Sequence, residues 1–208
     1  MWAGATGRVA AATPVRIMRV PALGGAPQTV LEGKGINGLA CAPSPAALCA
    51  FSEPSPDLKQ AVISSLDPVN GRGKELTRIN LWYPSDYYSW GLSRDGSRLA
   101  FVQPLIREGR IRIISLPGGA AREIYVKGWN YLSRLSWAAD ATGLFIGRHP
   151  ISGSTLLYVD LRGRSDVLWQ QGEIPGTPRT WGVPSPDGRH LAFVDYTADT
   201  NVWILQNF

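Results

Sequence analysis

Residues 185–193, SPDGRHLAF, decide the fold of this chain, because residues 93–101, SRDGSRLAF, repeat the same pattern. A weaker copy, AADATGLFI, stands at residues 138–146, and SPAALCAF at residues 44–51 fits the frame with one residue deleted at the turn. The aspartates of the three longer copies follow one another after 45 and 47 residues. A period in this range predicts an array of similar structural units.

Asp-Gly pairs mark a sharp turn inside each of the two strongest copies. They are Asp95-Gly96 and Asp187-Gly188. Glycine adopts positive φ without steric cost and aspartate hydrogen-bonds its own backbone, so the pair favours a tight hairpin. The apolar Leu-Ala-Phe run after each turn predicts a strand there. We therefore expect these four residues to act as structural turns.

A second series of glycine turns recurs with the same period as the first. It comprises Gly24-Gly25, residues 71–73, Gly118-Gly119 and Gly163. Two turn signals in fixed phase predict four strands in each unit. One meander cannot bury both of its faces, but copies packed radially can, as in a β-propeller. The sequence therefore predicts an all-β chain, a partial β-propeller of about four blades, each a four-stranded antiparallel meander.

The repeat frame also predicts how the chain is divided. Residues 1–13 are expected to form a disordered or irregular segment, and residues 14–208 the propeller. Its units are expected near residues 14–35, 36–84, 85–130, 131–175 and 176–208.

Composition favours short strands, because 23 glycines and 16 prolines interrupt helices throughout the chain. One segment has two interpretations. Ser55-Pro56-Asp57 and the apolar residues after it suit a capped helix, whereas the repeat frame predicts a strand from Gln60 to Leu66. We follow the repeat frame.

Charge and hydropathy exclude several classes of protein. The chain has 21 Lys and Arg against 16 Asp and Glu, and its net charge of +5 is spread without a run of five basic residues. We therefore expect no nucleic-acid partner. No stretch of about 18 uninterrupted apolar residues occurs, so no membrane span is expected. The first residues lack a basic start followed by an apolar run, so we expect no signal peptide.

The repeat at residues 185–193 resembles the TolB-like, WD-repeat-like propeller repeat, which also builds the N-terminal propeller of dipeptidyl-peptidase-IV-type proteases. Residues 126–129, 156–161 and 182–208 are similar to the C-terminal propeller half of bacterial receptor-type serine/threonine kinases and winged-helix regulators. The resemblance implies a non-catalytic binding or sensing module, the C-terminal part of a larger signalling protein in the periplasm or elsewhere outside the cytoplasm. The alternative is an accessory propeller of a dipeptidyl-peptidase-IV-type hydrolase whose catalytic domain is absent.

TolB-like propellers usually have six or more blades, so the resemblance implies that this propeller is partial. Unclosed blades expose edge strands and apolar faces. We therefore expect that copies of the chain can associate through them.

Catalysis is not indicated by the residues present. A nucleophile needs a base beside it, and His149 and His190 are the only histidines. His190 follows an Asp-Gly turn, which favours a solvated turn residue. No Gly-x-Ser-x-Gly motif occurs, and GRGK at residues 71–74 lacks other positions of a phosphate-binding loop. We expect no enzyme activity and no cofactor.

A calcium site is the other chemistry that the aspartates suggest. Ca²⁺ requires six to eight oxygens that converge on one point, whereas Asp95, Asp140 and Asp187 lie on separate predicted blades. Each already has a turn to stabilise. We therefore expect no metal.

Cys41 and Cys49 flank one turn. The frame aligns Cys49 with Leu99, Leu144 and Leu191, and Cys41 with Trp90 and Leu135. Both cysteines are therefore predicted to be buried. They are either free thiols that act as small apolar side chains or a cross-strand disulfide formed in an oxidising compartment.

Propeller geometry places the Asp-Gly and Gly-rich turns on one face and the two longer connections of each unit on the other. Exposed Tyr, Trp and Arg contribute most to interface energetics. We expect a protein or peptide partner to bind the second face through Tyr87, Tyr88, Trp129, Arg107 and Arg179. Alternatively, these aromatic side chains wedge between neighbouring blades, since tryptophan is usually mostly buried.

Overall fold

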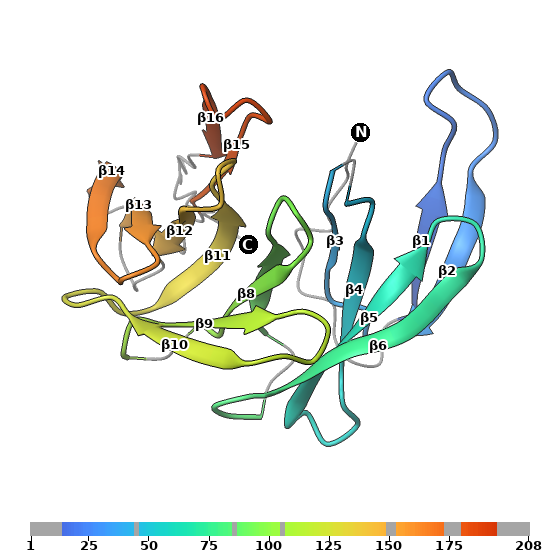
Figure 1. Ribbon diagram of the computed structural model, residues 1–208, viewed down its shortest axis with the longest axis horizontal. Helices are drawn as coiled ribbons and strands as arrows, with labels where there is room; N and C mark the ends of the chain where they lie inside the picture. The colour runs from blue at the N-terminus through green and yellow to red at the C-terminus, as the bar shows by residue number, and fades with distance from the viewer. Residues whose placement is uncertain are drawn as a thin grey trace, which may run out of the picture.

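The computed structural model describes residues 14–43, 46–84, 87–104, 107–148, 153–172 and 180–194, which form strands, turns and loops without a helix. Figure 1 shows the sheets following one another in an arc around a common centre. Three antiparallel sheets have four strands each, and a two-stranded sheet lies at either end of the series. The predicted fold class is confirmed: the chain is all-β and forms a partial β-propeller.

Each four-stranded sheet is a meander, in which neighbours in the sequence are neighbours in space. Sheet 1 contains β3 (Leu39–Cys41), β4 (Cys49–Pro54), β5 (Gln60–Asp67) and β6 (Gly71–Asn80). Sheet 2 contains β7 (Ser89–Leu92), β8 (Arg98–Val102), β9 (Arg110–Ser115) and β10 (Ala121–Tyr125). Sheet 3 contains β11 (Leu132–Trp137), β12 (Gly143–Arg148), β13 (Ser154–Asp160) and β14 (Ser165–Gln171). The N-terminal sheet pairs β1 (Pro14–Arg19) with β2 (Gln28–Lys34), and the C-terminal sheet pairs β15 (Trp181–Pro184) with β16 (Leu191–Val194).

The sheets fall inside the units that the repeat frame outlines. The units near residues 36–84, 85–130 and 131–175 each enclose one four-stranded sheet. Residues 1–13, predicted to be irregular, lie outside the described residues. The first strands of successive sheets, β3, β7, β11 and β15, contact one another. They therefore lie on the inner side of the arc, with β6 and β14 further out (Figure 1).

Residues 60–66 belong to strand β5, as the repeat frame predicts. The turn before β5 explains why a helix does not form. Oδ1 of Asp57 accepts hydrogen bonds from Ser55 Oγ at 2.6 Å and from the Lys59 backbone N–H at 3.1 Å, while Leu58 has a φ of +57°. Left-handed backbone at Leu58 ends any helical run and turns the chain back on itself.

Asp95 and Gly96 form the tight turn between β7 and β8. Oδ1 of Asp95 accepts hydrogen bonds from Ser93 Oγ at 2.6 Å and from the Ser97 backbone N–H at 3.1 Å, and Gly96 has a φ of +68°. Hydrogen bonds from Ser93 and then Ser97 lower the pKa of Asp95 to about 2. The carboxylate is therefore charged and bound to the turn at neutral pH.

The same turn recurs in sheet 3 and in the C-terminal sheet. Asp187 and Gly188 form it between β15 and β16, where Gly188 has a φ of +72°. Between β11 and β12, Oδ1 of Asp140 accepts a hydrogen bond from the Thr142 N–H at 3.0 Å, and Ala141 takes the glycine position with a φ of +58°. The turn therefore forms even where glycine is replaced.

Buried apolar side chains fill the joints between successive sheets. A tryptophan also crosses each joint between the four-stranded sheets. Trp90 Nε1 donates a hydrogen bond to Ser52 Oγ at 2.7 Å, and Trp137 Nε1 donates one to the Gly91 carbonyl at 3.0 Å. A Cβ at Gly91 would lie 3.2 Å from Leu135 Cδ1, so glycine lets sheets 2 and 3 approach closely.

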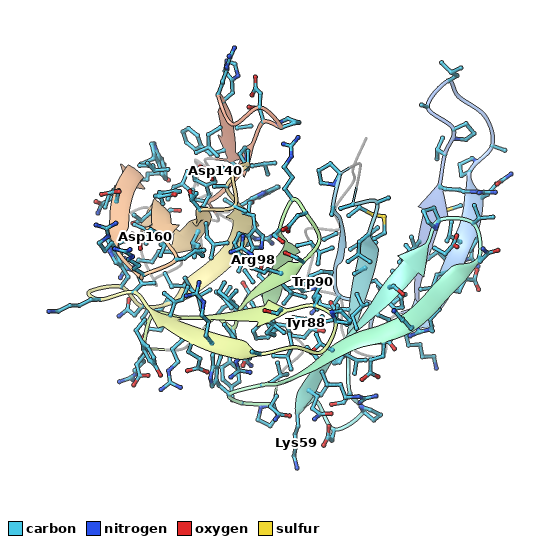
Figure 2. All side chains as sticks on the ribbon, in the orientation of Figure 1. Lys59, Tyr88, Trp90, Arg98, Asp140 and Asp160 are labelled. Carbon is cyan, nitrogen blue, oxygen red and sulfur yellow. A yellow bond between two sulfur atoms is a disulfide. The ribbon has the colours of Figure 1, made fainter. Side chains whose placement is uncertain are left out.

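Cys41 and Cys49 are directly paired residues of β3 and β4 and form a disulfide (Figure 2). Both side chains are half-buried, so the prediction that they are buried is wrong. The alignment of Cys41 is wrong as well, because the residue opposite Leu99 is Leu92 and not Trp90. Seven residues separate the cysteines and six separate Leu92 from Leu99, so this turn has gained a residue where the sequence alignment removed one.

Candidate functional site

The candidate site lies where connections gather at one end of the sheets. In a meander, the second turn and the link to the next sheet lie at the end opposite to the first and third turns. Residues 81–84 and 87–88 link β6 to β7, residues 103–104 and 107–109 link β8 to β9, and residues 126–131 link β10 to β11. We call these three connections the loop face.

Gln103, just after β8, forms hydrogen bonds with the backbone of the β6–β7 connection. Its buried side chain accepts a hydrogen bond from the Trp82 backbone N–H at 2.9 Å and donates one to the Tyr83 carbonyl at 2.8 Å. The Tyr83 hydroxyl also donates to the Pro104 carbonyl. Two connections that are far apart in sequence are therefore held as one rigid surface.

Gly109 joins the β8–β9 connection to the β10–β11 connection. Its carbonyl accepts a hydrogen bond from the Val126 N–H at 2.8 Å. A Cβ at Gly109 would lie 2.6 Å from the Trp129 carbonyl oxygen, so only glycine permits this approach. The contact brings the backbone next to Arg107 close to the segment that carries Trp129.

Trp129 is half-buried and packs against the apolar core between sheets 2 and 3. The Arg148 guanidinium lies 5.7 Å from the centre of its ring and donates hydrogen bonds to Asn130 Oδ1 at 3.1 and 3.3 Å. The indole is thus held in place while part of it stays accessible to solvent. A preordered aromatic side chain loses little conformational entropy on binding.

The exposed charges of the loop face are mainly positive. Arg107 and Lys127 are exposed, and within the described part of the chain neither forms an ion pair. In the described parts of these connections the acidic residue is Glu108, and it pairs with Arg110, whose guanidinium also lies 5.5 Å from the centre of the Tyr125 ring. The described part of the loop face therefore offers two cations that no described carboxylate neutralises.

The structure separates the five residues predicted to contact a partner. Arg107 and Trp129 lie on the connections that Gly109 joins, and Tyr87 is half-buried in the β6–β7 connection. Tyr88 is only 5% exposed, and its ring centre lies 5.5 Å from that of Phe101 inside the core (Figure 2). Tyr88 is therefore a core residue, as the alternative interpretation expects, and we correct its assignment. Arg179 lies outside the described residues.

Sequence reasoning missed three cationic residues at this surface: Lys127, Arg110 and Arg148. Lys127 stands two residues before Trp129 and could have been found from that spacing. Arg110 and Arg148 lie at the ends of strands β9 and β12, and only the packing of the connections brings them near aromatic rings. Their role depends on contacts that no local pattern encodes.

The described residues offer no constellation for covalent chemistry. The backbone N–H of His190 donates to Ser185 Oγ at 3.0 Å, so His190 lies in the turn between β15 and β16, and His149 lies outside the described residues. No three side chains of the types His, Cys, Asp and Glu gather there in a group able to hold a metal ion. Among these residues, no helix has the length and composition of a membrane span.

The chain has the fold of TolB-like and WD-repeat-like β-propellers. Its four-stranded sheets follow one another around a centre, a tryptophan hydrogen-bonds across each joint between them, and their turns recur in the same positions. TolB from Acinetobacter baumannii superimposes with a TM-score of 0.56 at 14% identity, over 82% of this chain and 46% of its own. The Cps50 (Swd1) propeller domain of Myceliophteria thermophila gives 0.53 at 13% identity, over 80% and 52%. Hydrazine synthase of Kuenenia stuttgartiensis gives 0.54 at 15% identity, over 81% and 46%.

This chain therefore spans about half the length of each of these three proteins. No protein-family model matches the sequence, and no curated protein matches it. At these low identities, the similarity establishes the fold alone.

Proposed function

We propose that this chain is a non-catalytic propeller module that binds a protein or peptide partner on its loop face. One observation carries the proposal: the backbone at Gly109 joins the connection that carries half-buried Trp129 and exposed Lys127 to the one that carries exposed Arg107. Tryptophan and arginine are the residue types enriched among those that dominate binding energy. A rigid scaffold that presents them is suited to recognition.

The charge of the loop face favours an acidic partner segment. Among the described residues, Arg107 and Lys127 have no carboxylate at ion-pair distance, and the one acidic side chain that the described parts of these connections carry, Glu108, is engaged by Arg110. Opposite charge on a partner would steer it to this surface and fix its orientation. An apolar side chain flanked by Asp or Glu would match Trp129 and both cations.

A sensing role in a larger signalling protein extends this proposal. Its support is the sequence resemblance to the propeller half of receptor-type kinases, together with the greater length of the matched structures. The disulfide between Cys41 and Cys49 supports a location outside the cytoplasm, because disulfides persist in oxidising compartments.

The preference for an acidic partner can be tested by selecting peptides that bind the purified chain from a random display library. Fluorescence anisotropy then measures the affinity of each selected peptide. Arg107→Glu is expected to weaken binding by about tenfold or more, which corresponds to about 1.4 kcal/mol. Trp129→Ala should weaken it at least as much. Arg162→Glu reverses an exposed charge at the opposite end of sheet 3 and is the matched control, with no expected change.

Acidic peptides whose affinity falls with salt and with Arg107→Glu would support the proposal. Selected peptides that bind both loop-face variants normally, or that respond equally to Arg162→Glu, would overturn it. Thermal unfolding followed by circular dichroism verifies that each variant is folded. If Trp129→Ala unfolds, Arg107→Glu decides the result, because its side chain is exposed.

A further inference from the structure

The same four residues form a buried strand in sheet 2 and an exposed one in the C-terminal sheet. Strand β8 contains Leu-Ala-Phe-Val at residues 99–102, and each of these side chains is 0% exposed. Strand β16 is Leu-Ala-Phe-Val at residues 191–194, where Phe193 is 45% and Val194 is 42% exposed. Strand β16 therefore has the composition of an interior strand, but the other described residues do not cover it as they cover β8.

Strands β15 and β16 are the first half of a blade. Leu191 pairs with Pro184 just as Leu99 pairs with Leu92 at the start of sheet 2, so β15 and β16 correspond to first and second strands. Among the described residues, β16 has no partner other than β15. Within that part of the chain, the outer edge of β16 is unpaired, and an edge of this kind can accept a further strand.

Strands β1 and β2 are the second half of a blade. Strand β2 leads directly into β3, as the fourth strand of sheet 1 leads into sheet 2. It also packs beside β6 in the outer position, where a Cβ at Gly71 would lie 2.8 Å from the Val30 carbonyl oxygen. Among the described residues, β1 pairs with β2 alone, so its inner edge is the one a second strand would occupy. The two end sheets are complementary halves.

One face of the N-terminal sheet is apolar and the other is polar, which suits a blade that has a different neighbour on each side. Its apolar face, with Ile17 and Leu31, packs against Phe51 and Leu66 of sheet 1. The opposite face is polar and exposed: it carries Lys34 and the ion pair of Arg16 with Glu32 at 2.7 Å. If the N-terminal sheet completed the blade that β15 and β16 begin, this polar face would lie against the sheet 3 that precedes β15.

Sheet 3 presents acidic groups on that side. Ser136 Oγ donates a hydrogen bond to the Gly182 carbonyl at 2.5 Å, so this face of sheet 3 points toward the C-terminal sheet. Tyr158 shares the face, because the cross-strand partner of both Ser136 and Tyr158 is Phe145. Asp166 lies opposite Tyr158, and Asp160 lies two residues along the strand. Asp160 is already paired with Arg164 at 2.7 Å. Asp166 is exposed, and its carboxylate is placed to meet a cation of an incoming N-terminal sheet.

We propose that a second copy of this chain supplies its β1 and β2 to the blade that β15 and β16 begin. The exchange is reciprocal, so two copies related by a two-fold axis share two completed blades. Figure 1 shows the two end sheets at opposite ends of the arc, which favours a partner's strands over the chain's own. The partner's sheet 1 would then cover Val194 as sheet 3 covers Val102. This inference is independent of the proposed function.

Light scattering during size-exclusion chromatography tests the proposal on the intact chain. The expected mass is twice the 22.6 kDa of one chain. Two variants change opposite halves of the shared blade. Val194→Asp changes the half formed by β15 and β16, and the double charge reversal Arg16→Glu with Lys34→Glu changes the half formed by β1 and β2. Each alone should give monomers. Arg122→Glu reverses an exposed charge on β10 and is the control, expected to remain dimeric.

Mixing the two variants discriminates between modes of assembly. In a mixed dimer one interface carries all the substitutions and the other carries none, so the mixture should recover dimer that neither variant forms alone. A wild-type chain that stays monomeric at high concentration overturns the proposal. So does a charge-reversed variant that remains dimeric while Val194→Asp does not, because that result indicates contact between two C-terminal sheets. Circular dichroism verifies that the variants are folded.

Discussion

The hairpin of β3 and β4 and the hairpin of β7 and β8 begin their sheets in the same way, but different chemistry closes them. In the second hairpin, Ser93 and Ser97 donate hydrogen bonds to Asp95, and Gly96 provides the left-handed backbone. In the first, a disulfide joins the directly paired Cys41 and Cys49. The repeat therefore requires that the chain reverse at this point, whereas the means of reversal varies between blades.

Sheet 3 shows how little of the hydrogen-bonded turn is needed. Asp140 binds the backbone N–H of Thr142, but the position of Ser93 holds Ala138 and the position of Gly96 holds Ala141. The contact common to both turns is the aspartate that accepts a backbone N–H two residues later. The serine and the glycine add stability to it. Substitutions can measure each contribution separately.

Among changes to these turns, removing the disulfide is expected to lower the free energy of unfolding the most. The double variant Cys41→Ser with Cys49→Ser is expected to unfold about 2–3 kcal/mol more easily, because the closed loop no longer restricts the unfolded chain. Urea unfolding with and without reductant measures it. Reductant should destabilise the wild type by a similar amount and leave the variant unchanged. Equal stability of the two chains would show that the β3–β4 hairpin does not need its crosslink.

Removing the buried serine hydroxyl of the β7–β8 turn should have the next largest effect. Ser93 Oγ is buried; it donates to Asp95 and accepts a hydrogen bond from the Arg98 N–H at 2.9 Å. Ser93→Ala should cost about 1–2 kcal/mol, since a backbone donor loses its partner. Ser97→Ala removes an exposed hydroxyl that also bonds Asp95, and it should cost less. Equal losses in denaturant unfolding would refute the importance of burial.

Restoring glycine to the turn of sheet 3 should have the smallest effect, and in the opposite direction. Ala141 holds a φ of +58°, which costs an L-residue about 1 kcal/mol. Ala141→Gly should therefore raise the melting temperature slightly. The converse, Gly96→Ala, should lower it, because the added Cβ meets its nearest neighbour at an ordinary 3.4 Å and only the backbone is strained. A destabilised Ala141→Gly would contradict this account.

Most of the fold could be predicted from the sequence, because turns in a fixed phase determine a meander. The strand at residues 60–66 is the clearest case: the repeat frame outweighed a local helix signal, and the Asp57 turn explains why. The alignment failed at Cys41 because an insertion and a deletion of one residue look alike where the Asp-Gly pair is missing. Strand register was therefore predictable only where the turn retained its signature.

The candidate site could be predicted only in part. Trp129 and Arg107 are recognisable as aromatic and cationic residues on long connections, but their proximity depends on Gly109, whose role appears only in space. Tyr88 is indistinguishable from Tyr87 in the sequence, and the pairing of β7 with β8 places it over Phe101. Burial of a residue beside a strand depends on tertiary packing that spacing does not encode.

The indole that crosses each inner joint couples the sheets energetically. If sheet 1 unfolded alone, Trp90 would lose its acceptor on Ser52, and loss of sheet 2 would deprive Trp137 of the Gly91 carbonyl. An unmatched donor of this kind costs about 1–3 kcal/mol when it stays buried. Local opening is therefore penalised in the neighbouring sheet, and the three central sheets should melt together as a single cooperative unit.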